Sequence, residues 1–497
     1  MSSYLIGFDI GSSSVKASLV NADTSETIRS VHYPPTEMDV VSRQKGWAEQ
    51  NPELWWENVC NASEKLLSDI SIDVSKIIGI GLSYQMHGLV LVDENYQVLR
   101  PSIIWSDSRA VEIGNKAFIE IGEKKCLDHL MNSPGNFTMS KLKWVFENEP
   151  EIYEQVHKFM LPGDFIAMKM TGRITSTIPG MSEAMLWDFK NNKIADFVLQ
   201  YFGFDQKVVP EILPTFSIQG NLTPGSAKQL GLCPGIPIAY RAGDQPNNAM
   251  SLNVFNPGEI AATGGTSGVV YAVVDHPVSD EQSRVNGFAH VNYTKLDPKI
   301  GVLLCINGTG SLYRWIRQQV ATDNISYNDM EKAASAVPVG SDGLRVIPFG
   351  NGAERMLNNR NIGSQIVNLQ FNRHTRSHLY RAALEGIAFS FVYGIKILNE
   401  IGIRSHVIRV GNDNLFQSEI FATTVSALTK CKIEVIGTTG AAGAALGAGI
   451  GVGRYENTQQ AFGKIEVKDV IDKQDLKGSY SIAYKNWTKD LGKLIID

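Results

Sequence analysis

The sequence predicts an α/β protein built from two similar halves. A turn rich in small residues, Gly11–Val15, lies between two apolar segments, and a second turn of this kind, Gly265–Val269, follows about half a chain length later. In both halves, short apolar segments typical of strands alternate with segments of helical periodicity. A repeat on this scale indicates two similar α/β units, because solenoid repeats are far shorter.

The first half is expected to begin with a β-hairpin. Leu5–Ile10 and Val15–Val20 are the apolar strands that flank the first turn, where glycine and serine suit a tight bend. Pro52 marks the start of a helix expected over Glu53–Ser68, whose apolar residues recur near helical spacing. Two further strands are expected at Ile77–Leu82 and Ile236–Tyr240.

The second half is expected to begin with the strands Glu259–Thr263 and Val269–Val274 around the second turn. The turn signal Asn256-Pro257-Gly258 places the boundary between the halves near 251–257. We therefore expect an N-terminal domain over 1–252, a C-terminal domain over 253–453 and a polar appendage over 454–497. The later elements are expected to be a helix, a strand, a helix and a strand at Thr375–Gly394, Val407–Val410, Leu415–Lys430 and Cys431–Ile436.

Composition excludes several classes of protein. A net charge of −5 and a pI near 6.0 provide neither a basic face for nucleic acid nor a polybasic membrane anchor. The five cysteines are scattered without CxxC spacing, which favours reduced thiols and a cytoplasmic location. Neither a secretion signal nor a run of eighteen apolar residues is found, so no membrane span is expected.

The two hairpins are candidate phosphate-binding elements. Amide groups and hydroxyls at such a bend can surround phosphate oxygens, and two facing hairpins could hold a polyphosphate. Asp9, near the end of the first strand, is a candidate Mg²⁺ ligand, since this ion prefers oxygen ligands. The alternative is an ordinary surface hairpin with a turn aspartate. The candidate nucleotide-binding residues are Gly11, Ser12, Ser13, Lys16, Gly265 and Thr266.

Two further segments place polar residues after buried strands. The first is Gln85-Met86-His87-Gly88, where a histidine could orient hydroxyl groups. The second is Gly243-Asp244-Gln245, where a lone carboxylate could accept a proton. The alternatives are a core or capping histidine and a turn aspartate.

These segments together resemble the FGGY carbohydrate kinases, and the likeness extends over most of residues 4–453. Within that family it is greatest for the xylulokinases, whose matching strand ends in Gln-Met-His-Gly. Gly46–Trp56 is similar to another family element, and 137–144 and 364–385 fit the two family signatures with one deviation each. The resemblance implies two actin/hexokinase-like (ribonuclease H-like) domains around a central cleft, with ATP and Mg²⁺ as cofactors.

The resemblance also implies roles for individual residues. It assigns the catalytic base to Asp244, a further catalytic and metal-binding role to Asp9, and contacts with the sugar to Met86 and His87. Gln245 follows the base and joins the substrate-binding candidates. Asp107, in a stretch similar to a family Trp-Asn-Asp-x-x-Arg element, could contact the sugar or pair with Arg109. Gly411 and Asn414 are the expected adenosine contacts, in a segment that lacks two of the family's usual glycines.

The implied activity is ATP-dependent phosphorylation of D-xylulose to D-xylulose 5-phosphate. The alternatives are a kinase for another ketose or polyol, such as ribulose or glycerol, and a catalytically silent sugar sensor with an actin-like fold. The expected partners are a small sugar and ATP, without nucleic acid or membrane. A homodimer is compatible with the sequence.

Overall fold

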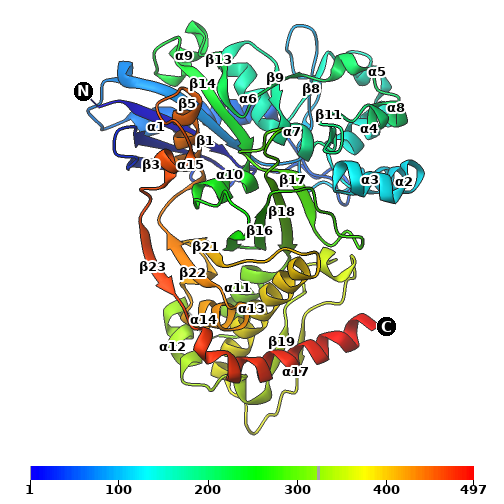
Figure 1. Cartoon of the computed structure of the whole chain (residues 1–497), viewed down its shortest axis with the longest axis vertical. Helices are drawn as coiled ribbons and strands as arrows, with labels where there is room; N and C mark the ends of the chain where they lie inside the picture. The colour runs from blue at the N-terminus through cyan, green and yellow to red at the C-terminus, as the bar shows by residue number, and fades with distance from the viewer. Residues whose placement is uncertain (1, 322–324, 497) are drawn as a thin grey trace.

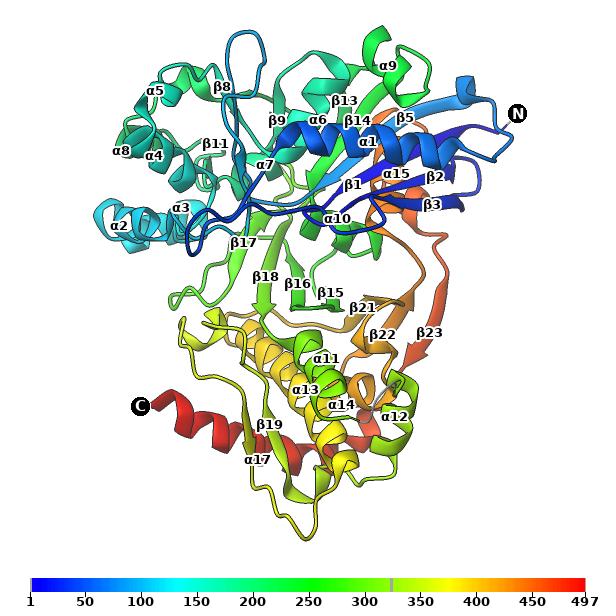
Figure 2. The same cartoon turned by 180° about the vertical axis from the view of Figure 1, so that it is seen from behind.

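The protein folds into two α/β bodies stacked along its long axis (Figures 1 and 2). The computed structural model describes residues 2–321 and 325–496. A six-stranded sheet forms the centre of the first body and a seven-stranded sheet that of the second. The predicted two-part α/β fold is thus confirmed.

The first sheet has the strand order β13-β14-β5-β1-β2-β3. The hairpin of β1 and β2 is antiparallel, and Asp9 is paired with Lys16 next to its turn. β5 runs parallel to both β1 and β14, so these three strands end at the same edge of the sheet. The strands are β1 (Tyr4–Ile10), β2 (Val15–Asn21), β3 (Thr27–Tyr33), β5 (Ile77–Tyr84), β13 (Phe216–Asn221) and β14 (Pro237–Gly243).

The second sheet repeats this arrangement, with the order β17-β18-β16-β15-β21-β22-β23. β15 and β16 form the second hairpin, and β15 runs parallel to β21, as β1 does to β5. The strands are β15 (Glu259–Gly264), β16 (Gly268–Val274), β17 (Asn286–Ala289), β18 (Ile300–Ile306), β21 (Val407–Gly411), β22 (Lys432–Ile436) and β23 (Val467–Ile471).

The helices agree with the predicted ranges except in one place. The helices expected over 53–68 and 375–394 are α1 (Pro52–Leu67) and α13 (Arg376–Glu400). The single helix expected over 415–430 is instead a short 3-10 turn, η5 (Leu415–Gln417), followed by α14 (Glu419–Thr429). The break lies at Ser418, whose hydroxyl accepts from Phe421 N at 3.1 Å and begins a new helix.

One helix of the C-terminal half covers the sheet of the N-terminal half. α15 (Gly440–Gly451) packs across β1 and β5, as Figure 1 shows in orange. A Cβ atom on Gly7 would lie 1.8 Å from Ala441 O, and one on Gly81 would lie 1.9 Å from Ala444 O. Only glycine permits this approach, because a side chain at either position would collide with the backbone of α15.

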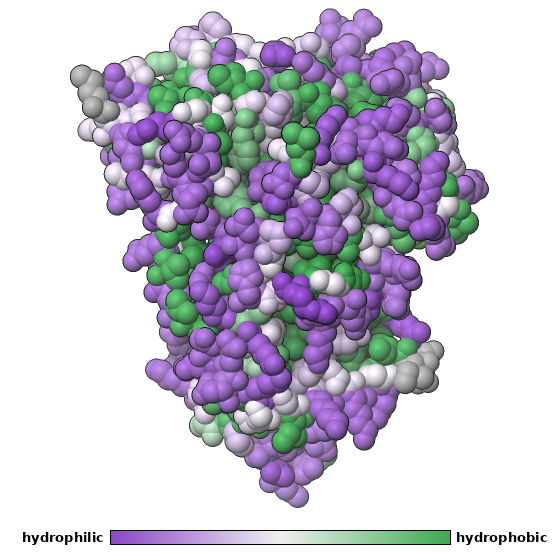
Figure 3. All heavy atoms as spheres, viewed as in Figure 1, coloured by the Kyte–Doolittle hydropathy of each residue, from purple (hydrophilic) through white to green (hydrophobic). Residues whose placement is uncertain are grey.

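Residues after 454 return to the second body. β23 pairs antiparallel with β22 at the edge of the second sheet, and α17 (Lys477–Ile496) crosses the end of this body (Figure 1). α13 is long and apolar enough to cross a membrane, but 83% of its most apolar window is buried inside the fold. Polar residues cover most of the face in Figure 3, and apolar residues appear there in small, separate groups.

Candidate active site

Two carboxylates lie at the same edge of the six-stranded sheet. Asp9 is the next-to-last residue of β1, and Asp244 follows the last residue of β14 and begins α10 (Asp244–Ser251). β5 lies between the two strands, and its Ser83 hydroxyl donates to Asp9 Oδ1 at 2.8 Å. The topology therefore brings the two predicted catalytic residues together.

Asp244 has the proton affinity that a base needs near neutral pH. Burial, followed by the negative charge of Asp9, raises the pKa of Asp244 to about 7. Hydrogen bonds from Gln245 and the positive charge of Lys16 act in the opposite direction. A carboxylate with this pKa is a more effective proton acceptor than an ordinary surface aspartate.

His87 follows the end of β5 and has a left-handed backbone, with φ of 64°. Its ring contacts Phe137 edge-on at 4.7 Å and lies 5.4 Å from Phe288, which belongs to β17 in the second body. Burial lowers the pKa of His87 to about 3, so the imidazole is neutral. Its Nδ1 lies 3.2 Å from the main-chain oxygen of Glu183. Because that oxygen can only accept a hydrogen bond, Nδ1 carries the ring proton. Nε2 is then unprotonated and can accept a hydrogen bond.

Glu183, the last residue of α7 (Ile178–Glu183), contributes a buried carboxylate behind this histidine. Its Oε1 accepts from the Tyr84 hydroxyl at 2.7 Å, and its Oε2 accepts from His87 N at 2.9 Å. The residue is 1% exposed, and burial raises the pKa of Glu183 well above its usual range. Sequence reasoning missed Glu183 because no local motif marks it.

Lys141 lies on the other side of the His87 turn. It belongs to α4 (Thr138–Asn148), is fully buried, and donates to His87 O at 2.8 Å and Ile104 O at 3.0 Å. Burial lowers the pKa of Lys141 to about 7. The sequence marked this lysine only as part of a signature, without a role.

Met86 and Gln245 lie next to the catalytic candidates. Met86 is 5% exposed and packs in an apolar cluster with Phe137 and Phe288. A Cβ atom on Gly243 would lie 2.5 Å from Met86 Cγ, so this glycine permits the two strand ends to meet. Gln245 follows Asp244 in the first turn of α10 and donates to its carboxylate.

Asp107, predicted either to contact the sugar or to pair with Arg109, lies in a buried ion pair with Arg109. The residue is 0% exposed, and its Oδ2 accepts from Ala48 N at 2.6 Å and from Arg109 Nη2 at 2.7 Å. The guanidinium of Arg109 also pairs with Glu49 at 2.8 Å and stacks over Trp47 at 3.8 Å. Asp107 is paired in this way because Arg109 lies only two residues further along the chain and its guanidinium folds back onto the Asp107 carboxylate.

Neighbouring groups fix the two hairpin turns. In the first, Ser12 O accepts from Gln50 Nε2 at 2.7 Å, and Ser12 Oγ lies 3.4 Å from the indole nitrogen of Trp105. Gly11 N donates to Ser14 O at 3.0 Å and closes the turn around Ser13. In the second, Gly265 O accepts from Gly310 N and from the Thr309 hydroxyl, both at 3.0 Å.

A cavity of about 320 Å³ lies beside the second hairpin and is lined by Gly265, Thr266 and Asn414, all predicted nucleotide-binding residues. Gly411 does not line it, although Asn414 Nδ2 donates to Gly411 O at 3.2 Å. Gly411 lines a separate cavity of about 540 Å³. Side chains in the first cavity that sequence reasoning missed include Arg314, Tyr327 and Gln417.

A hydrogen-bonded row joins the two bodies near His87. Asn132, after α3 (Glu123–Leu130), donates to Gly287 O at 2.6 Å and accepts from Asn286 Nδ2 at 2.8 Å. Arg355 of the second body donates to Asn286 Oδ1 and, at 2.8 Å, to Ser283 O. The charge of Arg355 is one of the causes that lower the pKa of His87, after burial and Lys141. These hydrogen bonds therefore hold the guanidinium of Arg355, from the second body, near His87 of the first body.

The sheet edge suits a divalent cation that also binds phosphate. Within residues 2–321 and 325–496, no group of three or more His, Cys, Asp or Glu side chains is arranged to hold a metal ion. Mg²⁺ in phosphoryl-transfer enzymes usually has one or two carboxylate ligands, and substrate phosphates and water complete its shell. Asp9 and Asp244 provide two carboxylates whose mutual repulsion a cation would relieve.

The chain matches known protein families over most of its length. The model of the N-terminal domain of the FGGY family of carbohydrate kinases matches residues 4–251, and that of the C-terminal domain matches residues 260–451. The xylulose kinase of Bacillus subtilis (strain 168) is 30% identical over 474 residues, which cover 92% of this chain and 90% of the relative. The gluconokinase of the same organism is 27% identical over 492 residues, which cover 96% and 91%.

Solved structures agree with the fold. The xylulose kinase from Rhodospirillum rubrum superposes with a TM-score of 0.87 at 23% identity, and the match covers 99% of each chain. At this identity the likeness establishes that the two chains share a fold.

Proposed function

The chain belongs to the FGGY family of carbohydrate kinases, and we propose that it transfers the γ-phosphoryl group of ATP to D-xylulose. The main support is the position of His87 and Asp244 at one sheet edge, where a neutral imidazole and a carboxylate with a pKa of about 7 follow the ends of the neighbouring strands β5 and β14. The 30% identity to the xylulose kinase of Bacillus subtilis supports the choice of sugar.

In the proposed reaction, Asp244 accepts the proton of the terminal sugar hydroxyl. The hydroxyl oxygen forms a bond to the γ-phosphorus of ATP while the bond between this phosphorus and the β,γ-bridging oxygen breaks. ADP and D-xylulose 5-phosphate are the products, and the proton stays on Asp244 until it passes to solvent. Proton acceptance of this kind accelerates such reactions by about 10²–10⁴-fold.

The nucleotide is proposed to lie between the two hairpins. Its phosphates would contact the turns at Ser12 and Thr266, and its adenosine would occupy the 320 Å³ cavity beside Asn414. Asp9 would hold Mg²⁺, which, when bound, balances the charge of the phosphates. Lys16, opposite Asp9 in the hairpin, adds a positive charge at the same place.

A second candidate is a kinase of a related acceptor. The 27% identity to the gluconokinase of Bacillus subtilis over nearly the whole chain favours a sugar acid as the next substrate to test. Ribulose and glycerol are further acceptors. A catalytically silent sugar sensor is disfavoured because Asp9 and Asp244 are both present at the sheet edge.

The test is an assay of ADP release over a panel of D-xylulose, ribulose, gluconate and glycerol, each with ATP and Mg²⁺. We expect the highest kcat/KM for D-xylulose. A higher value for another acceptor would reassign the substrate, and no turnover with any would favour the sensor. Light scattering of the purified protein distinguishes a monomer from the proposed homodimer, and cell fractionation tests the proposed cytoplasmic location.

A further inference from the structure

The left-handed turn at His87 is held from both sides by buried ionisable side chains. Glu183 accepts the N–H of His87 at 2.9 Å, and Lys141 donates to its carbonyl at 2.8 Å. Glu183 is 1% exposed and Lys141 is 0% exposed, whereas the His87 side chain is 18% exposed. Glu183 and Lys141 are thus buried side chains that hold the backbone of His87, whose own side chain is partly accessible.

A non-glycine residue in this backbone region needs support, because the conformation is sparsely populated and unfavourable. The two hydrogen bonds to the His87 peptide groups supply it. Glu183 also bonds to the hydroxyl of Tyr84 at 2.7 Å, and Lys141 also bonds to Ile104 O at 3.0 Å. Each of the two side chains is thus held by a second hydrogen bond. For Glu183 the partner is Tyr84 at the end of β5, and for Lys141 it is Ile104 in the loop before Trp105.

Glu183 also determines which nitrogen of His87 carries the proton. Nδ1 lies 3.2 Å from Glu183 O and 3.5 Å from Glu183 Oε2, both of which can accept its proton. Nε2 is then the nitrogen that can accept a hydrogen bond from a sugar hydroxyl.

We propose that Glu183 and Lys141 are positioning residues for sugar recognition, which clamp the His87 peptide from both sides and hold its imidazole with Nε2 toward the sugar. The inference rests on the proposed role of His87 in binding the sugar. In this proposal both residues act on the sugar KM through His87 and leave the ATP KM unaffected.

The test uses the full-length protein with the variants Glu183→Ala, Glu183→Gln and Lys141→Met, each alone and combined with His87→Ala. Loss of a buried hydrogen-bond partner should raise the KM for D-xylulose by at least about fivefold in Glu183→Ala and in Lys141→Met. Glu183→Gln should stay within about threefold of wild type. Its amide oxygen can still accept from His87 N, and its NH₂ group can donate to the Tyr84 hydroxyl.

The double variants separate a positioning role from general loss of structure. If the clamp acts through His87, adding Glu183→Ala or Lys141→Met to His87→Ala should change the KM by less than about twofold. Equal effects with and without His87, or a parallel rise in the ATP KM, would overturn the inference. Should Glu183→Ala not fold, the Lys141→Met cycle decides the question alone.

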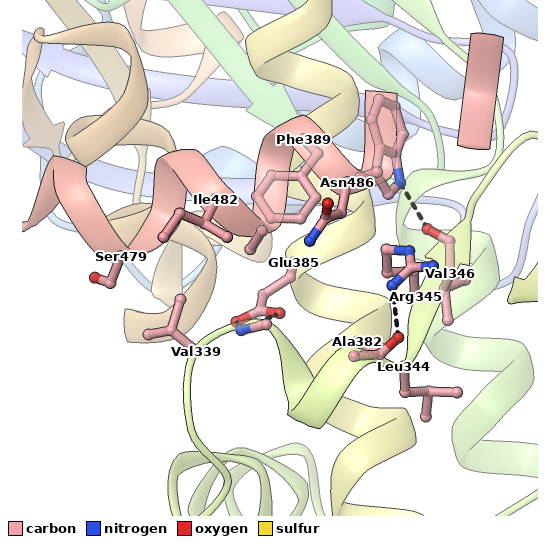
Figure 4. A pocket seen from close by; sticks show the side chains of 14 residues that line it. Val339, Leu344, Arg345, Val346, Ala382, Glu385, Phe389, Ser479, Ile482 and Asn486 are labelled. Atoms are coloured by element: carbon pink, nitrogen blue, oxygen red, sulfur yellow. Dashed lines mark hydrogen bonds between the residues drawn. The ribbon is translucent and has the colours of Figure 1, made fainter. Parts of the chain in front are cut away.

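Glu385 is the matched control. It is 2% exposed, and its carboxylate accepts from Gly340 N at 3.0 Å and from the Ser341 hydroxyl at 3.2 Å. It lines a separate pocket between α13 and α17 in the second body (Figure 4). Glu385→Ala and Glu385→Gln should lower the melting temperature without changing the KM for D-xylulose; a similar rise in that KM would count against the inference.

A wrong substrate assignment can be told apart from a wrong positioning role. If the wild-type protein does not phosphorylate D-xylulose, the same cycles are measured with the acceptor from the panel that it does use. If it uses none, the affinity for D-xylulose from titration calorimetry replaces KM. In either case independent effects of the clamp residues and His87 would reject the clamp.

Discussion

Asp9 and Asp244 lie on either side of β5 at one end of the six-stranded sheet, and the charge of Asp9 helps to raise the pKa of Asp244. The proton affinity of the proposed base thus depends on the charge at the proposed metal ligand. A cation bound at Asp9 would lower the pKa of Asp244 and favour its ionised form.

Replacement of Asp244 by Asn should remove the proton acceptor while keeping the shape of the side chain. We expect kcat to fall by about 10²–10⁴-fold. The KM for the sugar should change much less, because the amide can still bond to the hydroxyl. Steady-state kinetics of a variant with a normal circular dichroism spectrum provide the measurement, and a near-normal kcat would rule out Asp244 as the base.

The pH profile should report the pKa of Asp244. Below its pKa of about 7 the carboxyl group is protonated and cannot accept a proton, so kcat/KM should fall as the pH falls through this value. Asp9→Asn removes a negative charge that raises this pKa, so the residual activity of the variant should lose its acid limb at a lower pH. An unchanged or higher apparent pKa in Asp9→Asn would contradict the coupling.

Asp9→Ala should also weaken the dependence on Mg²⁺ while leaving the sugar affinity measurable without nucleotide. Titration of Mg²⁺ at fixed ATP tests this, and calorimetry with D-xylulose alone is the control. If the variant instead loses sugar binding and keeps its Mg²⁺ dependence, Asp9 is not the metal ligand.

The nucleotide side can be tested at Ser12, Thr266 and Tyr327. Ser12→Val and Thr266→Val each remove a hydroxyl from a hairpin turn, and Tyr327→Ala removes a ring from the 320 Å³ cavity. Each should raise the KM for ATP and leave the KM for D-xylulose unchanged. A change in the sugar KM alone would mean that the hairpins and the cavity do not hold the nucleotide.

His87→Ala should distinguish long from short substrates. Its loss should cost about 1–3 kcal/mol in kcat/KM for D-xylulose if a buried hydroxyl is left without a partner. The cost should be far smaller for glycerol, which is too short to extend from the base to His87. Comparable losses for both substrates would indicate that His87 only supports the fold.

The hairpins and the sheet edge could be predicted because local patterns encode them. Apolar strands followed by glycine and serine mark both turns, and parallel strands bring Asp9 and Asp244 to one edge whatever the side-chain packing.

The environment of the site could not be predicted, because it depends on contacts between distant segments. Glu183 meets Tyr84 and His87 only after α7 packs against β14 and β17, and nothing in the residues around it signals this. Asp107 looked like a ligand because a carboxylate after a strand is ambiguous until its partner is known. Its hydrogen bonds to Ala48 and Arg109 become visible only in the folded chain.

The packing of α15 on the first sheet means that the two halves cannot be separated by a single cut. A fragment that ends near residue 252 would contain β1 and β5 but not the helix that covers them, and Gly7 and Gly81 would leave a bare strip of backbone on the sheet. Such a fragment should aggregate when expressed alone and regain solubility when residues 253–497 are produced with it. The C-terminal half thus supplies a helix that the sheet of the N-terminal half needs to cover its backbone.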